Sequence, residues 1–322
     1  MIGSSAATGR SASANLAVGV AAAGVAALAW GTLVERNAFR IRRESLPVLA
    51  PGSRPITVLH LADIHMAPWQ NAKKQWLRGL VDLEPDLIVN TGDNLGHVDG
   101  IDSVEFALEP FGQTPGVFVN GSNDYHGPQL KNPLTYFTGP SNRHSEPPTL
   151  DTARLERVFA DHGWLNLNNA ASRLTVKGSL LEFVGVNDPH IGFDRLDKLP
   201  GALDELRENQ EWTDGSVAPD AVTIGVAHAP YRRVLNSLVT NGADVIFAGH
   251  THGGQVCVPG YGALVTNCDI PRQQVSGLSL WHHGVKTAYL NVSAGIGTSI
   301  YAPVRFACRP EAVVVTLEAR AA

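Results

Sequence analysis

Short apolar runs that alternate with helical segments are the feature that most constrains the fold of this chain. Residues 56–61, 86–90 and 117–119 have the composition of buried strands, and residues 69–83 carry apolar side chains at helical spacing. Strands that alternate with helices indicate βαβ crossovers. This part of the chain therefore predicts a parallel sheet with helices packed on it.

The rest of the chain continues the pattern and then changes. We expect further helices at residues 150–162 and 231–240, and further strands at 180–186, 221–227 and 244–248. Residues 127–149, which contain several prolines, are expected to form a surface loop near the mouth of a site. The tail has three β-rich segments without intervening helices, so we expect antiparallel strands at 287–292, 304–306 and 312–317.

Polar side chains of the metal-ligand type follow the predicted strands. In chain order they are Asp63, His65, Asp93, Asn123, His228, His250 and His252. The last two, in Gly249-His250-Thr251-His252-Gly253-Gly254, could by themselves be loop histidines that face water. In open α/β sheets, however, ligands collect beyond the carboxyl ends of the strands. Five strand ends with such residues therefore predict one metal site.

The number of candidate ligands indicates two ions. Six or seven oxygen and nitrogen donors exceed the three protein ligands of a catalytic zinc. They suit a pair of ions of the kind that assists phosphoryl hydrolysis, with Asp93, the central carboxylate in chain order, as the natural bridge. A donor set without thiolates favours Mn, Fe, Zn or Co.

An uncharged apolar segment precedes the predicted domain. Residues 16–34 are long enough for a membrane helix, and Trp30 near the end of the segment suits a membrane interface. We expect a tail at 1–15 and a membrane anchor at 16–34. A signal peptide cleaved near Ala27-Leu28-Ala29 and a mobile soluble tail are the alternatives.

Residues 35–55, which are basic and contain three prolines, are expected to be a linker to a folded domain at 56–322. More arginines follow the apolar segment than precede it, which favours a cell-membrane protein with a cytoplasmic catalytic side. Export is the alternative.

Bulk composition excludes several classes of protein. With 44% hydrophobic residues the chain is too apolar for disorder, and three cysteines are too few for a disulfide framework. The net charge of -5 and the lack of basic clusters in the domain disfavour a nucleic-acid partner.

The ordered polar blocks resemble the signature motifs of calcineurin-like metallophosphoesterases. The resemblance covers residues 56–255 and implies a four-layer α/β/β/α sandwich of two mixed sheets flanked by helices. It implies that one ion is held by Asp63, His65, Asp93 and His252. The other would be held by Asp93, an asparagine, His228 and His250. The tail, at 295–299, 303–306 and 309–311, resembles a bacterial subgroup with phosphodiesterases and relatives of UDP-2,3-diacylglucosamine hydrolase.

One block departs from the family pattern. Where the family usually has Gly-Asn-His followed by Asp or Glu, this chain has Gly121-Ser122-Asn123-Asp124. We expect Asn123 to be the metal ligand, because a serine hydroxyl is a weaker neutral donor. His126 is then the candidate general acid, and a solvated loop histidine is the alternative. Catalysis without a histidine acid would favour substrates with good leaving groups.

Together these features predict an enzyme, a metal-dependent phosphoesterase with two divalent ions. A hydroxide that bridges the ions would attack phosphorus, most favourably in a phosphodiester or pyrophosphate, on a small-molecule or lipid-linked substrate at a membrane. The alternative is a non-catalytic metal-binding scaffold with a degenerate third motif. Arg305 is expected to form an ion pair at a strand end rather than to bind phosphate, and His190 is a weaker candidate for lining the cleft.

Overall fold

Two six-stranded sheets form the centre of the molecule in a computed structural model that describes residues 12–128, 148–208 and 221–321. The first sheet has the order β1-β14-β2-β3-β4-β5. Its strands are Arg40–Leu49, Glu311–Ala319, Ile56–Leu61, Leu87–Asn90, Gly116–Phe118 and Leu165–Asn166. The second has the order β12-β13-β9-β8-β7-β6. Its strands are Gly277–His283, Lys286–Val292, Val245–Ala248, Val222–Ala227, Ser179–Gly185 and Ala170–Val176.

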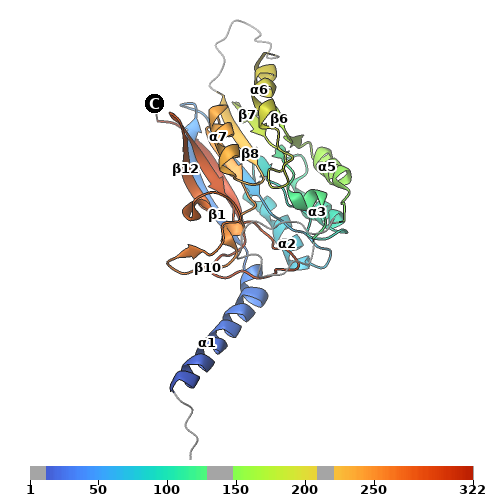
Figure 1. Cartoon of the computed structure of the whole chain (residues 1–322). Coiled ribbons are helices and arrows are strands. Elements are labelled where there is room, and N and C mark those ends of the chain that lie inside the picture. The colour runs from blue at the N-terminus through green and yellow to red at the C-terminus, as the bar shows by residue number, and fades with distance from the viewer. Residues whose placement is uncertain (1–11, 129–147, 209–220, 322) are drawn as a thin grey trace, which may run out of the picture.

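Helices cover the outer faces of both sheets (Figure 1). The longer ones are α2 (Asn71–Gly79), α3 (Ile101–Leu108), α5 (Thr152–Asp161), α6 (Leu199–Glu208) and α7 (Arg232–Thr240), and α4 (Ser122–Tyr125) is a single turn. A small hairpin, β10 (Cys257–Val258) and β11 (Gly262–Ala263), lies apart from the two sheets. The predicted helices of the domain and all but one of its predicted strands thus occur, with small shifts at their ends.

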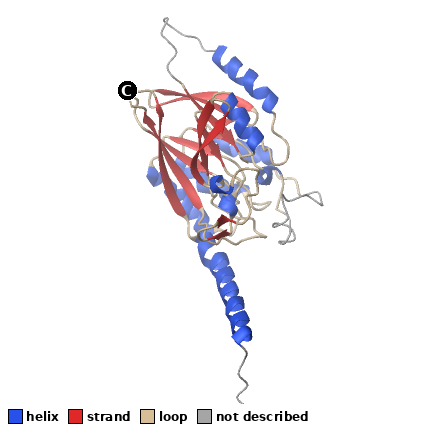
Figure 2. Ribbon diagram, turned by 60° about the vertical axis from the view of Figure 1, so that its left-hand side comes forward, coloured by secondary structure: helices blue, strands red, loops and turns tan. Residues whose placement is uncertain are grey.

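Three apolar cores hold these layers together. Val89 of the first sheet and Phe247 of the second belong to the central core, so the inner faces of the two sheets pack on each other. Phe159 of α5 lies in the core outside the first sheet, and Leu238 of α7 in the core outside the second. The architecture is therefore the predicted four-layer sandwich, which Figure 2 shows from the side.

Parallel pairing aligns the carboxyl ends of the central strands. In the first sheet β2, β3, β4 and β5 pair in parallel, and in the second β7, β8, β9 and β13 do. The strands at and near the outer edges make both sheets mixed, because β14 runs antiparallel to β2 and β12 antiparallel to β13. The alignment brings the loops after β2, β3, β4, β8 and β9 to one end of the sandwich.

Residues 35–55 are not a simple linker, which corrects our expectation. Residues 40–49 of the segment form β1, which pairs in parallel with β14 at the edge of the first sheet. Pro47 lies within this strand, next to a shift in register. An edge strand tolerates proline because one side of the strand needs no ladder hydrogen bond.

Other strands also differ from the expectation. Residues 304–306 do not form a strand, and only an isolated bridge joins Phe306 to Val256. The strands β6 and β12 were not predicted, because their side chains are mostly half-buried or exposed and lack a clear apolar pattern.

The N-terminal helix α1 (Ala12–Ala29) projects from the domain and continues as the short turns Trp30–Val34 and Glu35–Asn37 (Figures 1 and 2). The segment Ala14–Asn37 is long and apolar enough to cross a membrane, and almost none of it is buried against the domain. A signal sequence near the N-terminus would have the same length and composition.

Candidate metal centre

The predicted ligands converge between the two sheets. Asp63 and His65 follow β2 and Asp93 follows β3, while His228 follows β8 and His250 and His252 follow β9. Asn123 lies in α4, directly after β4. The tertiary structure thus brings together side chains that are up to 189 positions apart, the separation of residues 63 and 252.

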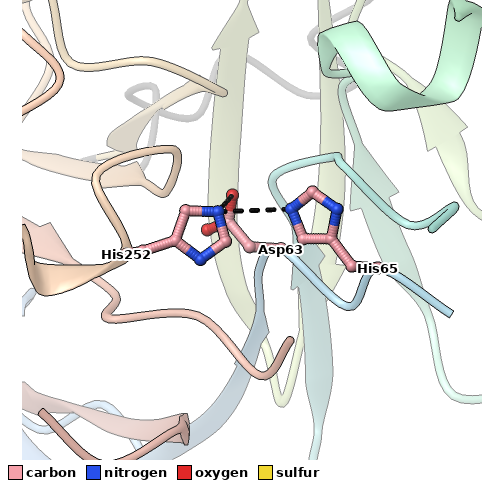
Figure 3. A group of neighbouring side chains, drawn as sticks. All are labelled: Asp63, His65 and His252. Atoms are coloured by element: carbon pink, nitrogen blue, oxygen red, sulfur yellow. Dashed lines mark hydrogen bonds and ion pairs between the residues drawn. The ribbon is translucent and has the colours of Figure 1, made fainter. Parts of the chain in front are cut away.

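Asp63, His65 and His252 form one group of possible ligands (Figure 3). Their ligand atoms all lie within 4.8 Å of one another. The Nε2 atoms of His65 and His252 are 3.2 Å apart, and Nε2 of His252 is 3.7 Å from Oδ1 of Asp63. The donors therefore face a common point.

Asp63, Asp93 and His228 form a second group with the same spacing. Each oxygen of Asp93 faces a different imidazole, since Oδ1 is 3.5 Å from Nε2 of His228 and Oδ2 is 3.5 Å from Nε2 of His65. Nδ1 of His250 lies 3.2 Å from Nε2 of His228. Asp93 therefore lies between the two histidine pairs.

Hydrogen bonds on the far side of the rings determine which nitrogen faces the centre. Nδ1 of His228 lies 2.8 Å from the Thr91 carbonyl, and Nδ1 of His252 lies 3.2 Å from the Gly297 carbonyl. A carbonyl can only accept, so these Nδ1 atoms carry a proton and the Nε2 atoms, which are the ones that could bind a metal, face inward.

The charge state of the buried groups fits a site for cations. Burial raises the pKa of Asp63 to about 7. Burial alone would lower the pKa of His228, but the charges of Asp93, Asp188 and Asp63 raise it to about 9. Burial lowers the pKa of His65 to about 4 and holds the pKa of His250 and His252 well below the usual range. Burial alone would raise the pKa of Asp93, but the neighbouring His228 and His65 hold it well below its usual range. Neutral imidazoles beside an ionised carboxylate are a donor set that divalent metals can occupy, once His228 and Asp63 give up their protons.

The backbone at the centre is strained. Asp63, His65, Asp93, His250 and His252 all have a positive φ, between 43° and 67°. Residues other than glycine rarely adopt this backbone conformation, and each instance costs about 1–3 kcal/mol. Strained residues cluster at functional sites, so five of them at one place support its assignment as a candidate site.

Two glycines allow the close approach of the strands. A Cβ on Gly249 would lie 2.6 Å from Oδ2 of Asp63, and a Cβ on Gly121 would lie 2.3 Å from Oδ1 of Asp93. Both distances are too short for carbon, so only glycine fits beside the two carboxylates.

The unusual third block places Asn123 at the centre. The Asn123 backbone N–H donates to Oδ1 of Asp93 at 2.8 Å, and its side-chain Nδ2 donates to Oδ2 at 2.6 Å. Asp124 positions the turn, because it accepts from the backbone N–H groups of Asp93, Asn94 and Gly121. His126 lies just beyond α4, where its backbone pairs with Thr149.

Two further side chains contact His250 at the centre: Asn267, which was not predicted as part of the site, and His190, which was a weaker candidate for lining the cleft. Nδ2 of Asn267 is 3.1 Å from Nε2 of His250. Asn267 is in the loop after β11 and no motif marks it, although its positive φ of 52° resembles that of the ligands. The ring centroid of His190 is 4.4 Å from that of His250, and Nδ1 of His190 is 2.9 Å from the Tyr231 hydroxyl.

Arg305 does not form the expected ion pair at a strand end, and its side chain is too deeply buried to contact a phosphate. Its guanidinium is fully buried, and Nη2 donates to the carbonyls of Ala294, Gly295 and Gly297. The same carbonyl of Gly297 faces His252. Arg305 therefore holds the loop that orients one predicted ligand.

Comparison with known proteins identifies a family. The family model described as calcineurin-like phosphoesterase matches residues 56–254. The protein YpbG of Bacillus subtilis is 27% identical, over 83% of this chain and 82% of that protein. A bovine transmembrane protein with a metallophosphoesterase domain is 25% identical over 84% of this chain, which spans only 55% of the bovine protein.

Similar solved structures share little sequence. TT1561 of Thermus thermophilus has 12% identity and a TM-score of 0.42, over 76% of this chain and 91% of that one. The NAD nucleotidase of Haemophilus influenzae has 9% identity and a TM-score of 0.44, over 76% of this chain and 51% of that one. The family match covers more than half of the chain and includes every predicted ligand. This chain therefore belongs to the calcineurin-like phosphoesterase family and is a metal-dependent phosphoesterase.

Proposed function

We propose that the centre holds two divalent ions and hydrolyses a phosphodiester or pyrophosphate at a membrane. The observation that carries this proposal is the position of Asp93, whose two oxygens face His65 and His228 separately. Such a carboxylate can bridge two ions. The remaining donors then divide into Asp63, His65 and His252 for one ion and Asn123, His228 and His250 for the other.

When bound, the ions supply Lewis-acid charge and lower the pKa of water. The protein supplies position: Thr91 and Gly297 orient the rings of His228 and His252, and Asp124 holds the turn that carries Asn123. Preorganised donors of this kind reduce the reorganisation needed as charge develops in the transition state.

We propose Asn123 rather than Ser122 as the ligand from the third block. Its amide already contacts Asp93, and a rotation of the amide by half a turn exchanges its nitrogen for its oxygen. His126 remains our candidate for the general acid. If its ring does not protonate the leaving group, the enzyme favours leaving groups of low pKa, such as the phenols of aryl diesters and the phosphates of pyrophosphates.

Membrane attachment through α1 supports a substrate that is itself near a membrane, either a small phosphoester or a lipid-linked one. The arginines that follow the helix support a cytoplasmic catalytic side. The likeness of the tail to the subgroup with UDP-2,3-diacylglucosamine hydrolase supports a lipid-linked pyrophosphate as one test substrate.

The test is metal analysis of the full chain together with hydrolysis of bis(p-nitrophenyl) phosphate in Mn²⁺. We expect Asp93→Ala to lose both ions and all activity above background, because it removes the carboxylate proposed to bind both ions. His252→Ala should lose mainly one ion. His282→Ala, which changes an exposed histidine, is the matched control and should behave as wild type.

Two results would refute the proposal. One is a wild-type content of a single ion at saturating Mn²⁺, and the other is unchanged metal content and activity in Asp93→Ala. To assign the acid, His126→Ala is compared on p-nitrophenyl and alkyl phosphodiesters. If His126→Ala hydrolysed the alkyl diester at the wild-type rate, His126 would be excluded as the general acid.

A further inference from the structure

The turns that continue α1 are hydrogen-bonded to residues 305–308, which follow the loop beside the candidate metal centre. The Gly31 carbonyl accepts a hydrogen bond from the Arg305 backbone N–H at 3.1 Å. The carboxylate of Glu35, which is buried, accepts from Cys308 N–H at 2.6 Å and from Trp30 Nε1 at 3.0 Å. The orientation of the helix is therefore coupled to residues 305–308.

The same segment supports the β10–β11 hairpin. Cys257 N–H donates to the Phe306 carbonyl at 2.8 Å, and Phe306 N–H donates to the Gln255 carbonyl at 3.0 Å. The side chain of Gln255 donates to the Ala302 carbonyl. The hairpin and the end of α1 thus lie at the same end of the domain, as both ribbon views show (Figures 1 and 2).

Apolar side chains are exposed at this end. Val258, Tyr261 and Leu264 of the hairpin region are 44%, 58% and 40% exposed, and Tyr301 is 48% exposed. We call these four residues the hairpin patch. Leu33, at the end of the helix, is 71% exposed. Aromatic and aliphatic side chains beside a membrane helix suit the boundary between lipid headgroups and acyl chains.

A basic side chain accompanies the hairpin patch. The guanidinium of Arg272 lies over the ring of Tyr261, 4.1 Å from its centroid. Arginine near a membrane surface is attracted to anionic lipid headgroups. Tyrosine with a stacked arginine therefore combines an apolar group for the lipid with a cation for the headgroup.

We propose that the hairpin patch docks on the bilayer into which α1 inserts, as a second contact between the domain and the lipid. This inference rests on the membrane attachment in the proposed function. Docking would also affect the site. The thiol of Cys257, in the hairpin, donates to the carbonyl of Gly253, which directly follows the predicted ligand His252. Docking would hold the metal centre close to the lipid surface and favour phosphoesters that the bilayer presents.

The experiment places a genetically encoded fluorescent amino acid at position 261 of the full chain, reconstituted in vesicles of phosphatidylcholine and phosphatidylglycerol. Brominated acyl chains quench fluorophores that reach them. We expect the label at 261 to lose most of its fluorescence in vesicles with brominated lipid and none in plain vesicles. Sedimentation with the vesicles shows separately that the chain is membrane-bound.

Position 285 provides the matched control. Val285 is fully exposed and apolar, but it lies in the turn between β12 and β13. The strand β13 then runs from Lys286 to Val292, which pairs with Ala248 just before the ligands. At ~3.4 Å per residue the turn is roughly 20 Å from that end of the sheet. A label at 285 should not be quenched.

Equal fluorescence at 261 in brominated and plain vesicles, with the chain membrane-bound, would overturn the docking. Failure of the chain to sediment with vesicles would also overturn it, whereas hydrolysis of a soluble diester would still test the proposed function. A second variant, Val258→Ser with Leu264→Ser, should reduce the quenching at 261 and leave hydrolysis of bis(p-nitrophenyl) phosphate unchanged. Unreduced quenching in this variant would contradict a role for the patch.

Discussion

At the scale of single residues, the orientation of each imidazole decides what the centre can bind. His228 and His252 direct Nε2 inward because Nδ1 faces a carbonyl, whereas His250 directs Nδ1 inward and leaves Nε2 to Asn267. If Nδ1 of His250 binds metal, Nε2 carries the proton and the Asn267 amide must present its oxygen. Asn267 is then a positioning residue for His250.

We therefore expect Asn267→Ala to weaken metal binding. Loss of a hydrogen-bond partner behind a ligating histidine typically reduces metal affinity by about 10–100-fold. The affinity is measured by competition with a chelating dye, and activity at saturating Mn²⁺ should largely recover. An unchanged affinity would show that Asn267 does not orient His250, and loss of activity at every metal concentration would indicate a different role.

The protonation of the centre predicts how metal affinity depends on pH. Without metal, His228 holds its proton up to about pH 9 and Asp63 up to about pH 7. An ion that binds the same atoms must displace these protons. Apparent affinity should therefore rise as the pH is raised from 7 to about 9 and level off above it.

Calorimetry in buffers with different ionisation enthalpies measures the protons released on binding. We expect release at pH 7.5 and little release above about pH 9.5, where His228 is already neutral. An affinity that does not change with pH over this range would contradict the assigned protonation state.

At the scale of elements, β1 ties the end of the N-terminal helix to the sheet and to the site. Glu311 of β14 is fully buried, and its carboxylate accepts from Arg40 and Arg42 of β1 at 2.6 and 3.1 Å. It also accepts from the backbone N–H of Ala294, in the loop that Arg305 holds. One carboxylate thus joins the edge strand to the loop beside His252.

We expect Glu311→Ala to reduce the free energy of unfolding by about 3 kcal/mol, because it leaves Arg42 and a backbone N–H without their buried partner. Urea unfolding measures the loss. Glu318→Ala, on the exposed end of the same strand, is the control and should change stability by less than about 0.5 kcal/mol. A loss in Glu311→Ala no larger than in the control would show that the pairing contributes little.

At the scale of the whole molecule, the candidate metal centre lies between the two sheets, and its candidate ligands come from both. An ion bound there links β2 and β3 of one sheet to β8 and β9 of the other. Because the unfolded chain cannot reproduce this arrangement, binding stabilises the fold by about 2.7 kcal/mol at a free ion concentration of 100 times Kd.

Thermal unfolding should therefore depend on metal. We expect Mn²⁺ to raise the Tm of the full chain and a chelator to reverse the effect. Asp93→Ala should show no increase with Mn²⁺, while the exposed-residue variant His282→Ala should respond as wild type does. An equal increase in Asp93→Ala and wild type would place the stabilising ion elsewhere.

Local sequence patterns were sufficient for much of the fold. The strands β8 and β9 are buried throughout and mostly apolar, and α7 repeats its apolar residues at helical spacing, so each could be predicted from its own residues. The strand β1 could not, because its burial depends on pairing with β14, 271 positions away between Arg40 and Glu311. A basic segment with prolines has no local feature that indicates such a partner.

The sequence by itself determined the fold class, the family and the ordered set of candidate ligands, because strand composition and the residues that end each strand are local properties. Only the tertiary structure decided which nitrogen of each histidine faces the centre, that Asn267 and His190 lie against His250, and that the β10–β11 hairpin and the end of α1 lie at the same end of the domain. These features are contacts between segments far apart in the chain. They depend on how two sheets and a helix pack, which no short stretch of sequence encodes.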